Sequence, residues 1–71
     1  MKRILLVEDD RLLNQTLVFH LTAEGYEVIP SHNIISAKEY LSKNTFDLII
    51  LDINLPDGNG FDLWDGITSY P

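Results

Sequence analysis

The sequence predicts an α/β protein in three layers, with a parallel β-sheet between helices. Three observations support this class. Short apolar runs alternate with amphipathic stretches in the order β-α-β-α-β-α, the connections are short, and the apolar runs are continuous rather than alternating in polarity. Such alternation implies right-handed crossovers and parallel strands, which are buried on both faces when helices cover the sheet.

The first strand and the first helix are bounded by charged and capping residues. Residues 4–7 form an apolar run with charge on both sides. A helix is predicted over residues 11–24, with Asp9 or Asp10 as its N-cap and Gly25 at the C′ position. The residues expected to face the core recur at helical spacing and are Leu13, Leu17, His20 and Leu21.

The second strand and the second helix follow directly. Residues 26–29 are predicted to form a strand that Pro30 ends. Ser31 or Asn33 can cap a helix over residues 34–42. One face of this helix is expected to hold Ile34, Ala37 and Leu41.

The last part of the chain contains the most hydrophobic run. A third strand is predicted over residues 46–51, and its residues 48–51 make it the best candidate for a central strand. Residues 52–60, rich in Asp, Asn, Gly and Pro, predict a loop, and a short third helix is expected to begin near Phe61.

Composition excludes several classes of protein. The chain has 71 residues, enough for one domain, and no cysteine, which excludes disulfides and thiolate zinc sites. Its net charge of −6 argues against a nucleic-acid-binding surface in this segment. No apolar run is long enough to span a bilayer, and the four apolar residues after Arg3 are too few for a signal peptide. We therefore expect a soluble, cytoplasmic domain.

Acidic residues follow two of the predicted strands. Glu8 and Asp9 come after the first strand, and Asp52 comes after the third. If these strands are neighbours, their ends lie about 5 Å apart, and the carboxylates repel one another unless a cation neutralises them. Oxygen ligands without His or Cys suit Mg²⁺, and a carboxylate beside that ion can act as a nucleophile toward a phosphoryl group. The alternative is that Asp9 and Asp10 only cap a helix and that Asp52 opens a polar turn.

The two segments that hold these acids resemble a known family. Residues 4–10 (ILLVEDD) and 46–60 (FDLIILDINLPDGNG) are similar to the receiver domain of bacterial two-component response regulators, and the resemblance covers the whole chain in register. It implies a flavodoxin-like fold with strand order 2-1-3-4-5, of which this chain would hold 2-1-3. The second segment is also similar to regulators that carry a DNA-binding output domain and control transcription.

The resemblance implies a role for each site residue. Asp52 would be the phosphoacceptor, which receives a phosphoryl group from the phosphohistidine of a sensor histidine kinase. Glu8 and Asp9 would hold Mg²⁺ together with Asp52, and Asn54 would supply its backbone carbonyl as a further ligand. Pro56 and Gly60 would shape the following loop. Such a protein is not an enzyme toward other substrates, because it catalyses only its own phosphorylation and dephosphorylation.

The chain departs from the family pattern in its length. A receiver domain has five strands and five helices over about 120 residues, so residues 1–71 are expected to be a partial receiver domain without the last two strands and helices. The family's hydroxyl residue and its late Lys have no counterpart, since Lys2, Lys38 and Lys43 all precede Asp52. The third strand, residues 46–51, would then be a bare edge that recruits a partner. We expect that the isolated chain aggregates or self-associates through this edge, that another chain completes it, or that it is part of a longer protein.

Three other interpretations of the function remain to be compared. Asp52-x-Asn54 begins like a calcium-binding EF-hand loop, but Pro56 and Leu63 stand at two ligand positions. The same residues loosely resemble the nucleophile motif of Mg²⁺-dependent phosphatases of the haloacid dehalogenase family, which carry a second Asp where this chain has Asn54. A non-phosphorylated pseudo-receiver that only binds proteins is a third.

The first predicted helix has a second stripe, opposite its core-facing stripe. This stripe either docks the kinase, as in the family, or is partly buried. It consists of Leu12, Gln15, Thr16 and Phe19.

Overall fold

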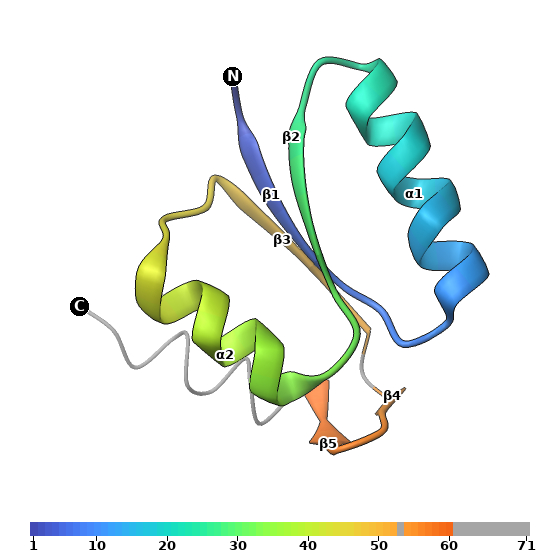
Figure 1. Cartoon of the computed structure of the whole chain (residues 1–71), viewed down its shortest axis with the longest axis vertical. Helices are drawn as coiled ribbons and strands as arrows, with labels where there is room; N and C mark the ends of the chain where they lie inside the picture. Colours follow the sequence, from blue (N-terminus) through green and yellow to red (C-terminus); the bar gives the residue numbers. More distant parts are fainter. Residues whose placement is uncertain (53, 61–71) are drawn as a thin grey trace.

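Three parallel strands form the centre of the molecule. In the computed structural model, which describes residues 1–52 and 54–60, the sheet order is β2-β1-β3. These strands are β1 (Arg3–Val7), β2 (Glu27–Ser31) and β3 (Leu48–Leu51). Helices α1 (Arg11–Ala23) and α2 (Ile34–Lys43) lie on opposite sides of the sheet (Figure 1). The predicted three-layer α/β architecture and the order 2-1-3 are thus confirmed.

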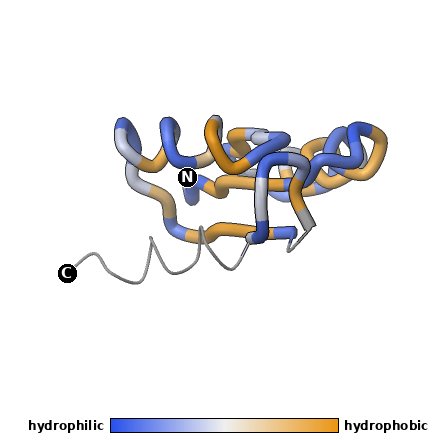
Figure 2. The backbone as a smooth tube through the Cα atoms, turned by 90° about the horizontal axis from the view of Figure 1, so that it is seen from below, coloured by the Kyte–Doolittle hydropathy of each residue, from blue (hydrophilic) through white to orange (hydrophobic). Residues whose placement is uncertain are grey.

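Burial is concentrated in β1. Its four apolar side chains, Ile4 to Val7, are at most 2% exposed, because β1 has a strand on each side and a helix on each face. Leu5 and Val7 join Ile34 and Ala37 of α2 in one core cluster. Figure 2 shows hydrophobic colouring along the strands. The core therefore fixes the carboxyl end of β1 firmly.

Hydrophobicity made residues 48–51 the best candidate for a central strand, but in the described sheet they form an edge strand, as the predicted order 2-1-3 requires. In this sheet β1 is central and β3 pairs with β1 alone, from Ile4↔Leu48 to Val7↔Leu51. Leu48 is accordingly 53% exposed. Hydrophobicity alone did not distinguish a strand with two neighbours from a strand with one.

Strand β2 continues through Pro30, so the prediction that this proline ends the strand is wrong. Pro30 pairs in register with Leu6, and Ser31 pairs with Val7. Proline has no N–H to donate, which excludes it from the middle of a sheet but not from an outer strand. Since β2 is an edge strand, the missing donor faces away from β1.

Helix α1 begins and ends as expected. The Asp10 carboxylate accepts a hydrogen bond from the Leu13 N–H at 3.0 Å and is the N-cap. Gly25 has a φ of 96°, a left-handed conformation that glycine adopts without strain, and it follows the C-cap Glu24.

The predicted core stripe of α1 is only partly correct. Leu17 and Leu21 are half-buried, but Leu13 is 43% exposed and His20 is exposed. The buried residue of this helix is Asn14, at 1% exposure. Helix α1 packs mainly on β2, so the face that it turns toward the sheet includes Asn14. The prediction missed this position because it counted mostly apolar residues as core positions.

Helix α2 follows the predicted pattern more closely. The Asn33 side chain caps it by accepting from the Ser36 N–H at 2.8 Å. Ile34 and Ala37 are buried, and Leu41 packs partly buried against the same cluster.

The segment predicted as a loop contains a small antiparallel hairpin. It consists of β4 (Asn54–Leu55) and β5 (Gly58–Asn59), with a turn between them. Gly58 has a φ of 153°, and a Cβ atom there would lie 2.8 Å from Cδ1 of Ile34. The hairpin therefore packs closely against the start of α2. The third helix expected near Phe61 lies outside the described residues.

Candidate functional site

The candidate site lies where β1 and β3 end. Hydrogen bonding continues one residue past each strand: the Asp52 N–H donates to the Val7 carbonyl at 2.9 Å, and the Glu8 N–H donates to the Ser31 carbonyl at 2.9 Å. The parallel ladder therefore holds Glu8 and Asp52 side by side at the carboxyl edge of the sheet, where ligands bind in open α/β folds.

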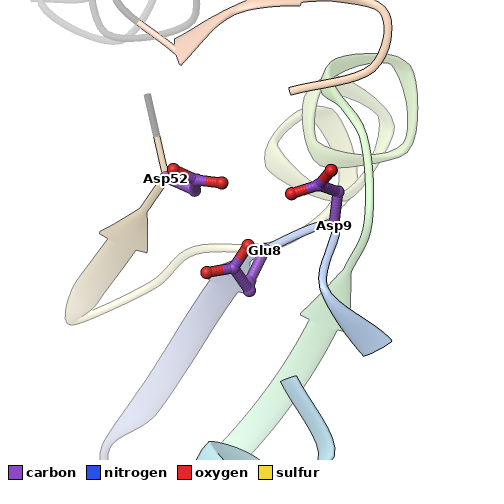
Figure 3. Close-up of side chains that lie close together, drawn as sticks. All are labelled: Glu8, Asp9 and Asp52. Carbon is purple, nitrogen blue, oxygen red and sulfur yellow. The ribbon is translucent and has the colours of Figure 1, made fainter. Parts of the chain in front are cut away.

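Three carboxylates meet at this edge. One ligand oxygen each from Glu8, Asp9 and Asp52 lies within 4.8 Å of the others (Figure 3). Glu8 and Asp52 are half-buried, and Asp9 is exposed. Asp10, the next acid in the chain, is not part of the cluster, because its carboxylate caps α1. Asp10 therefore caps the helix, whereas Glu8 and Asp9, which precede it, belong to the carboxylate cluster.

Both burial and the neighbouring acids act on the Glu8 carboxyl. Burial raises the pKa of the Glu8 carboxyl above its ordinary value, and the adjacent Asp52 carboxylate raises it further. The Asp10 N–H, which donates to Glu8 Oε2 at 3.3 Å, acts in the opposite direction. A bound cation would offset the repulsion between Glu8 and Asp52.

The donor set fits a hard divalent cation. All three groups are carboxylates, whose oxygens Mg²⁺ prefers, and one side of the cluster is open to water through Asp9. Mg²⁺ keeps several water ligands, so one or two carboxylates suffice to hold it. Asn54 begins β4, two residues after Asp52. Its role as a carbonyl ligand stays a prediction, because residue 53, which joins the two, lies outside the described residues.

The buried side-chain amide of Asn14 holds the main chain beside the carboxylate cluster, and the sequence analysis did not single it out. Asn14 Nδ2 donates to the carbonyl of Glu8 at 3.0 Å and to the carbonyl of Ser31 at 3.2 Å. The available signal was its spacing: Asn14 precedes Leu17 and Leu21 by three and seven residues, which is the period of a helix face.

Asp57 is the second residue that sequence reasoning did not single out. Its two carboxylate oxygens accept from the N–H groups of Ile34 at 2.7 Å and Ile35 at 3.0 Å, at the start of α2. The hydrogen bond from Ile34 is the main reason why the pKa of Asp57 lies below its ordinary value. The neighbouring Pro56 lies in the turn of the hairpin. Asp57 thus ties the hairpin that follows Asp52 to the second helix.

The second stripe of α1 is exposed. Leu12 and Phe19 are 74% and 72% exposed, and Gln15 and Thr16 are exposed as well. Beside this stripe, a groove of about 620 Å³ runs along α1, and Pro30 contributes to its wall. Within the described part of the chain, neither helix has the length and apolar character that crossing a membrane requires.

Comparison with known sequences gives a consistent family. The model of the family described as the response regulator receiver domain matches residues 4–71. The transcriptional regulatory protein CrdR of Helicobacter pylori is 39% identical over 68 residues, which are 96% of this chain and 32% of CrdR. The chain therefore spans about a third of the length of this curated relative.

Comparison with solved structures supports the same fold. The non-phosphorylated HemR receiver domain from Leptospira biflexa is 47% identical with a TM-score of 0.92, over 96% of this chain and 55% of that one. The response regulator TrrA from Thermotoga maritima, solved in complex with Mg(2+)-BeF, is 36% identical with a TM-score of 0.89, over 94% and 58%. A complex of the histidine kinase ThkA with TrrA matches at 34% identity and a TM-score of 0.92, over 100% and 61%.

Proposed function

The chain belongs to the receiver-domain family of response regulators in two-component signalling, and from this we propose that Asp52 accepts a phosphoryl group from the phosphohistidine of a sensor histidine kinase in a Mg²⁺-dependent reaction. The observation that carries the proposal is the cluster of Glu8, Asp9 and Asp52, whose ligand oxygens lie within 4.8 Å of one another. Neither a helix cap nor a polar turn requires three carboxylates to lie this close together.

Each acid has a distinct role in the proposed reaction. An Asp52 carboxylate oxygen attacks phosphorus, the bond from phosphorus to the histidine nitrogen breaks, and the imidazole leaves with its electron pair and takes up a proton. Glu8 and Asp9 would hold the ion from the β1–α1 connection, and the Asn54 carbonyl would be a further ligand. A bound Mg²⁺ would neutralise negative charge on the transferring group. TrrA, solved in complex with Mg(2+)-BeF, supports this assignment.

The partners follow from the same family. We propose that a histidine kinase docks on the exposed stripe of α1, which contains Leu12 and Phe19, and the ThkA–TrrA complex supports a kinase as the partner. We further propose that residues 1–71 are a partial receiver domain, that the complete protein is cytoplasmic, and that it controls transcription through a DNA-binding output domain. The name of CrdR supports the last step. In this proposal the protein is a self-modifying phosphoacceptor and not an enzyme toward other substrates.

Phosphorylation by a small donor tests the proposal without knowledge of the kinase. The full chain is incubated with radiolabelled acetyl phosphate and Mg²⁺, next to the variants Asp52→Asn and Asp10→Asn. Asp10→Asn is the matched control, because it makes the same chemical change outside the cluster and asparagine is an equally good N-cap. We expect label on the parent chain and on Asp10→Asn, no label on Asp52→Asn, and no label when a chelator removes Mg²⁺. Equal labelling of all three proteins would reject Asp52 as the acceptor.

A further inference from the structure

We propose that Asn14 is a positioning residue of the metal site: its buried amide ties the main chain of Glu8 to the end of β2 and so keeps the carboxylates of Glu8 and Asp9 within coordinating distance of Asp52. This inference rests on the proposed function, since it assigns a residue to the metal site of that reaction. Asn14 itself touches neither the ion nor the phosphoryl group.

The first step is the contacts of the amide. Nδ2 of Asn14 donates one hydrogen bond to the Glu8 carbonyl at 3.0 Å and one to the Ser31 carbonyl at 3.2 Å. Asn14 is 1% exposed, so water does not compete for these contacts. One side chain of α1 thus holds the residue after β1 and the last residue of β2 together.

The second step is the short connection that carries two of the three carboxylates. Only residues 8–10 join β1 to α1. Asp10 is fixed at the helix end by its capping bond to the Leu13 N–H, and Glu8 is fixed at the strand end by its N–H bond to the Ser31 carbonyl. The Glu8 carbonyl, which leads into Asp9, is held by Asn14. The direction of the main chain into Asp9 therefore depends on this amide.

The third step is the rigidity of the anchor. Ser31 is 1% exposed, and its hydroxyl is hydrogen-bonded to the Asn33 carbonyl at 3.0 Å and to Ser36 Oγ at 2.6 Å. These contacts connect the end of β2 to the start of α2. Asn14 accordingly ties the acidic connection to a fixed point of the core and not to a surface loop.

The need to donate hydrogen bonds to two main-chain carbonyls explains why position 14 holds an amide side chain. A leucine of similar size would leave the Glu8 carbonyl without its side-chain donor, and the main chain would turn to satisfy it. A second-layer residue of this kind acts on metal affinity through the geometry of the ligands, and its loss typically costs about 10- to 100-fold in affinity. A residue that only stabilised the fold would lower the melting temperature and leave the metal affinity of the folded protein unchanged.

Calorimetric titration with Mg²⁺ alone tests the inference. The full chain is compared with Asn14→Leu and with Thr22→Leu, a control at an exposed position of α1 outside the proposed docking stripe. We expect Asn14→Leu to raise the Kd for Mg²⁺ by about 10- to 100-fold and Thr22→Leu to leave it unchanged. Hydrogen exchange at residues 8–10 without Mg²⁺ should be faster in Asn14→Leu only. Labelling by acetyl phosphate should return toward the parent rate when Mg²⁺ is raised to saturation.

The outcomes separate this inference from the proposed function. A folded Asn14→Leu variant with the parent Kd overturns the role of Asn14 and leaves the role of Asp52 intact. A parent chain that binds no Mg²⁺ overturns both. If Asn14→Leu does not fold, Asn14→Ser decides, because its hydroxyl is too short to reach both carbonyls. An unchanged Kd in that folded variant overturns the inference equally.

Discussion

At the scale of single residues, the site balances repulsion between carboxylates against the binding of a cation. Glu8 is half-buried beside Asp52, and both burial and that neighbour raise its pKa. The same closeness, within 4.8 Å for all three ligand oxygens, brings three oxygen donors together at one place. A substitution at Glu8 should therefore have opposite effects with and without the ion.

The variant Glu8→Gln should show this reversal. Without Mg²⁺ we expect it to unfold at a temperature equal to or above that of the parent chain, because one repelling charge is gone. With Mg²⁺ at ten times the parent Kd, the parent should gain about 1.4 kcal/mol in its free energy of unfolding, and Glu8→Gln should gain much less. Thermal melts with and without the ion measure both effects. An equal gain in both proteins would show that Glu8 is not a ligand.

The raised pKa of Glu8 also predicts a pH dependence. The folded state binds the Glu8 proton more tightly than the unfolded state, whose value is near the ordinary 4.5. The contribution of Glu8 to stability is therefore fully present below 4.5 and is lost as pH rises through the higher pKa of the folded state. Denaturant titrations without metal should show this decline in the parent chain and not in Glu8→Gln. A parallel pH profile in the two proteins would contradict it.

At the scale of elements, a carboxylate from the hairpin completes the N-terminus of α2. Asp57 accepts from the N–H groups of Ile34 and Ile35, which have no partner inside the helix because they lie in its first turn. The Asn33 cap satisfies a third N–H group, that of Ser36. The start of helix α2 is thus stabilised in part by a residue that lies 23 positions after Ile34 in the sequence.

The variant Asp57→Ala should lower the melting temperature by a few degrees at pH 7, because two N–H groups lose their acceptors. Since the pKa of Asp57 is lowered, its contribution is present above the ordinary value of 3.8 and is lost as pH falls through the lower folded value. The difference from the parent should therefore vanish in strong acid. Glu39→Ala is the control, since its exposed bond to Lys43 contributes little. Equal melting temperatures of Asp57→Ala and the parent at pH 7 would contradict the capping role.

The elements also show which features the sequence can predict. Strand β1 and the caps Asp10 and Asn33 were foreseeable, because apolar runs and capping residues act locally. The course of β2 through Pro30 and the role of Asp57 depend on sheet order and on contacts between distant segments. The convergence of the three acids was foreseeable only because parallel strands bring their carboxyl ends to one edge. The burial of Asn14 required knowledge of how α1 is rotated on the sheet.

At the scale of the whole molecule, the net charge and the outer strand have opposite effects on association between copies of the chain. The formal charge of −6 makes copies of the chain repel one another. In the described sheet, β3 pairs with β1 alone, and Leu48 on β3 is 53% exposed. Leu48 also lines a groove of about 330 Å³ together with Ile4 and Leu21. An apolar edge of this kind favours pairing with another chain.

We therefore predict that the 71-residue chain self-associates through β3 and that Leu48→Lys weakens this association, because a charge at an outer strand opposes edge-to-edge pairing. The matched control is Ile35→Lys, which places the same charge at a 71% exposed apolar position on α2. Sedimentation velocity should show a larger species for the parent and for Ile35→Lys, and a smaller one for Leu48→Lys. Added salt should strengthen association of the parent by screening its negative charge.

Two outcomes would contradict this prediction or reassign its cause. A stable monomer with a sharp melting transition would contradict it. Equal dissociation by both lysine variants would assign the effect to net charge and not to the β3 edge.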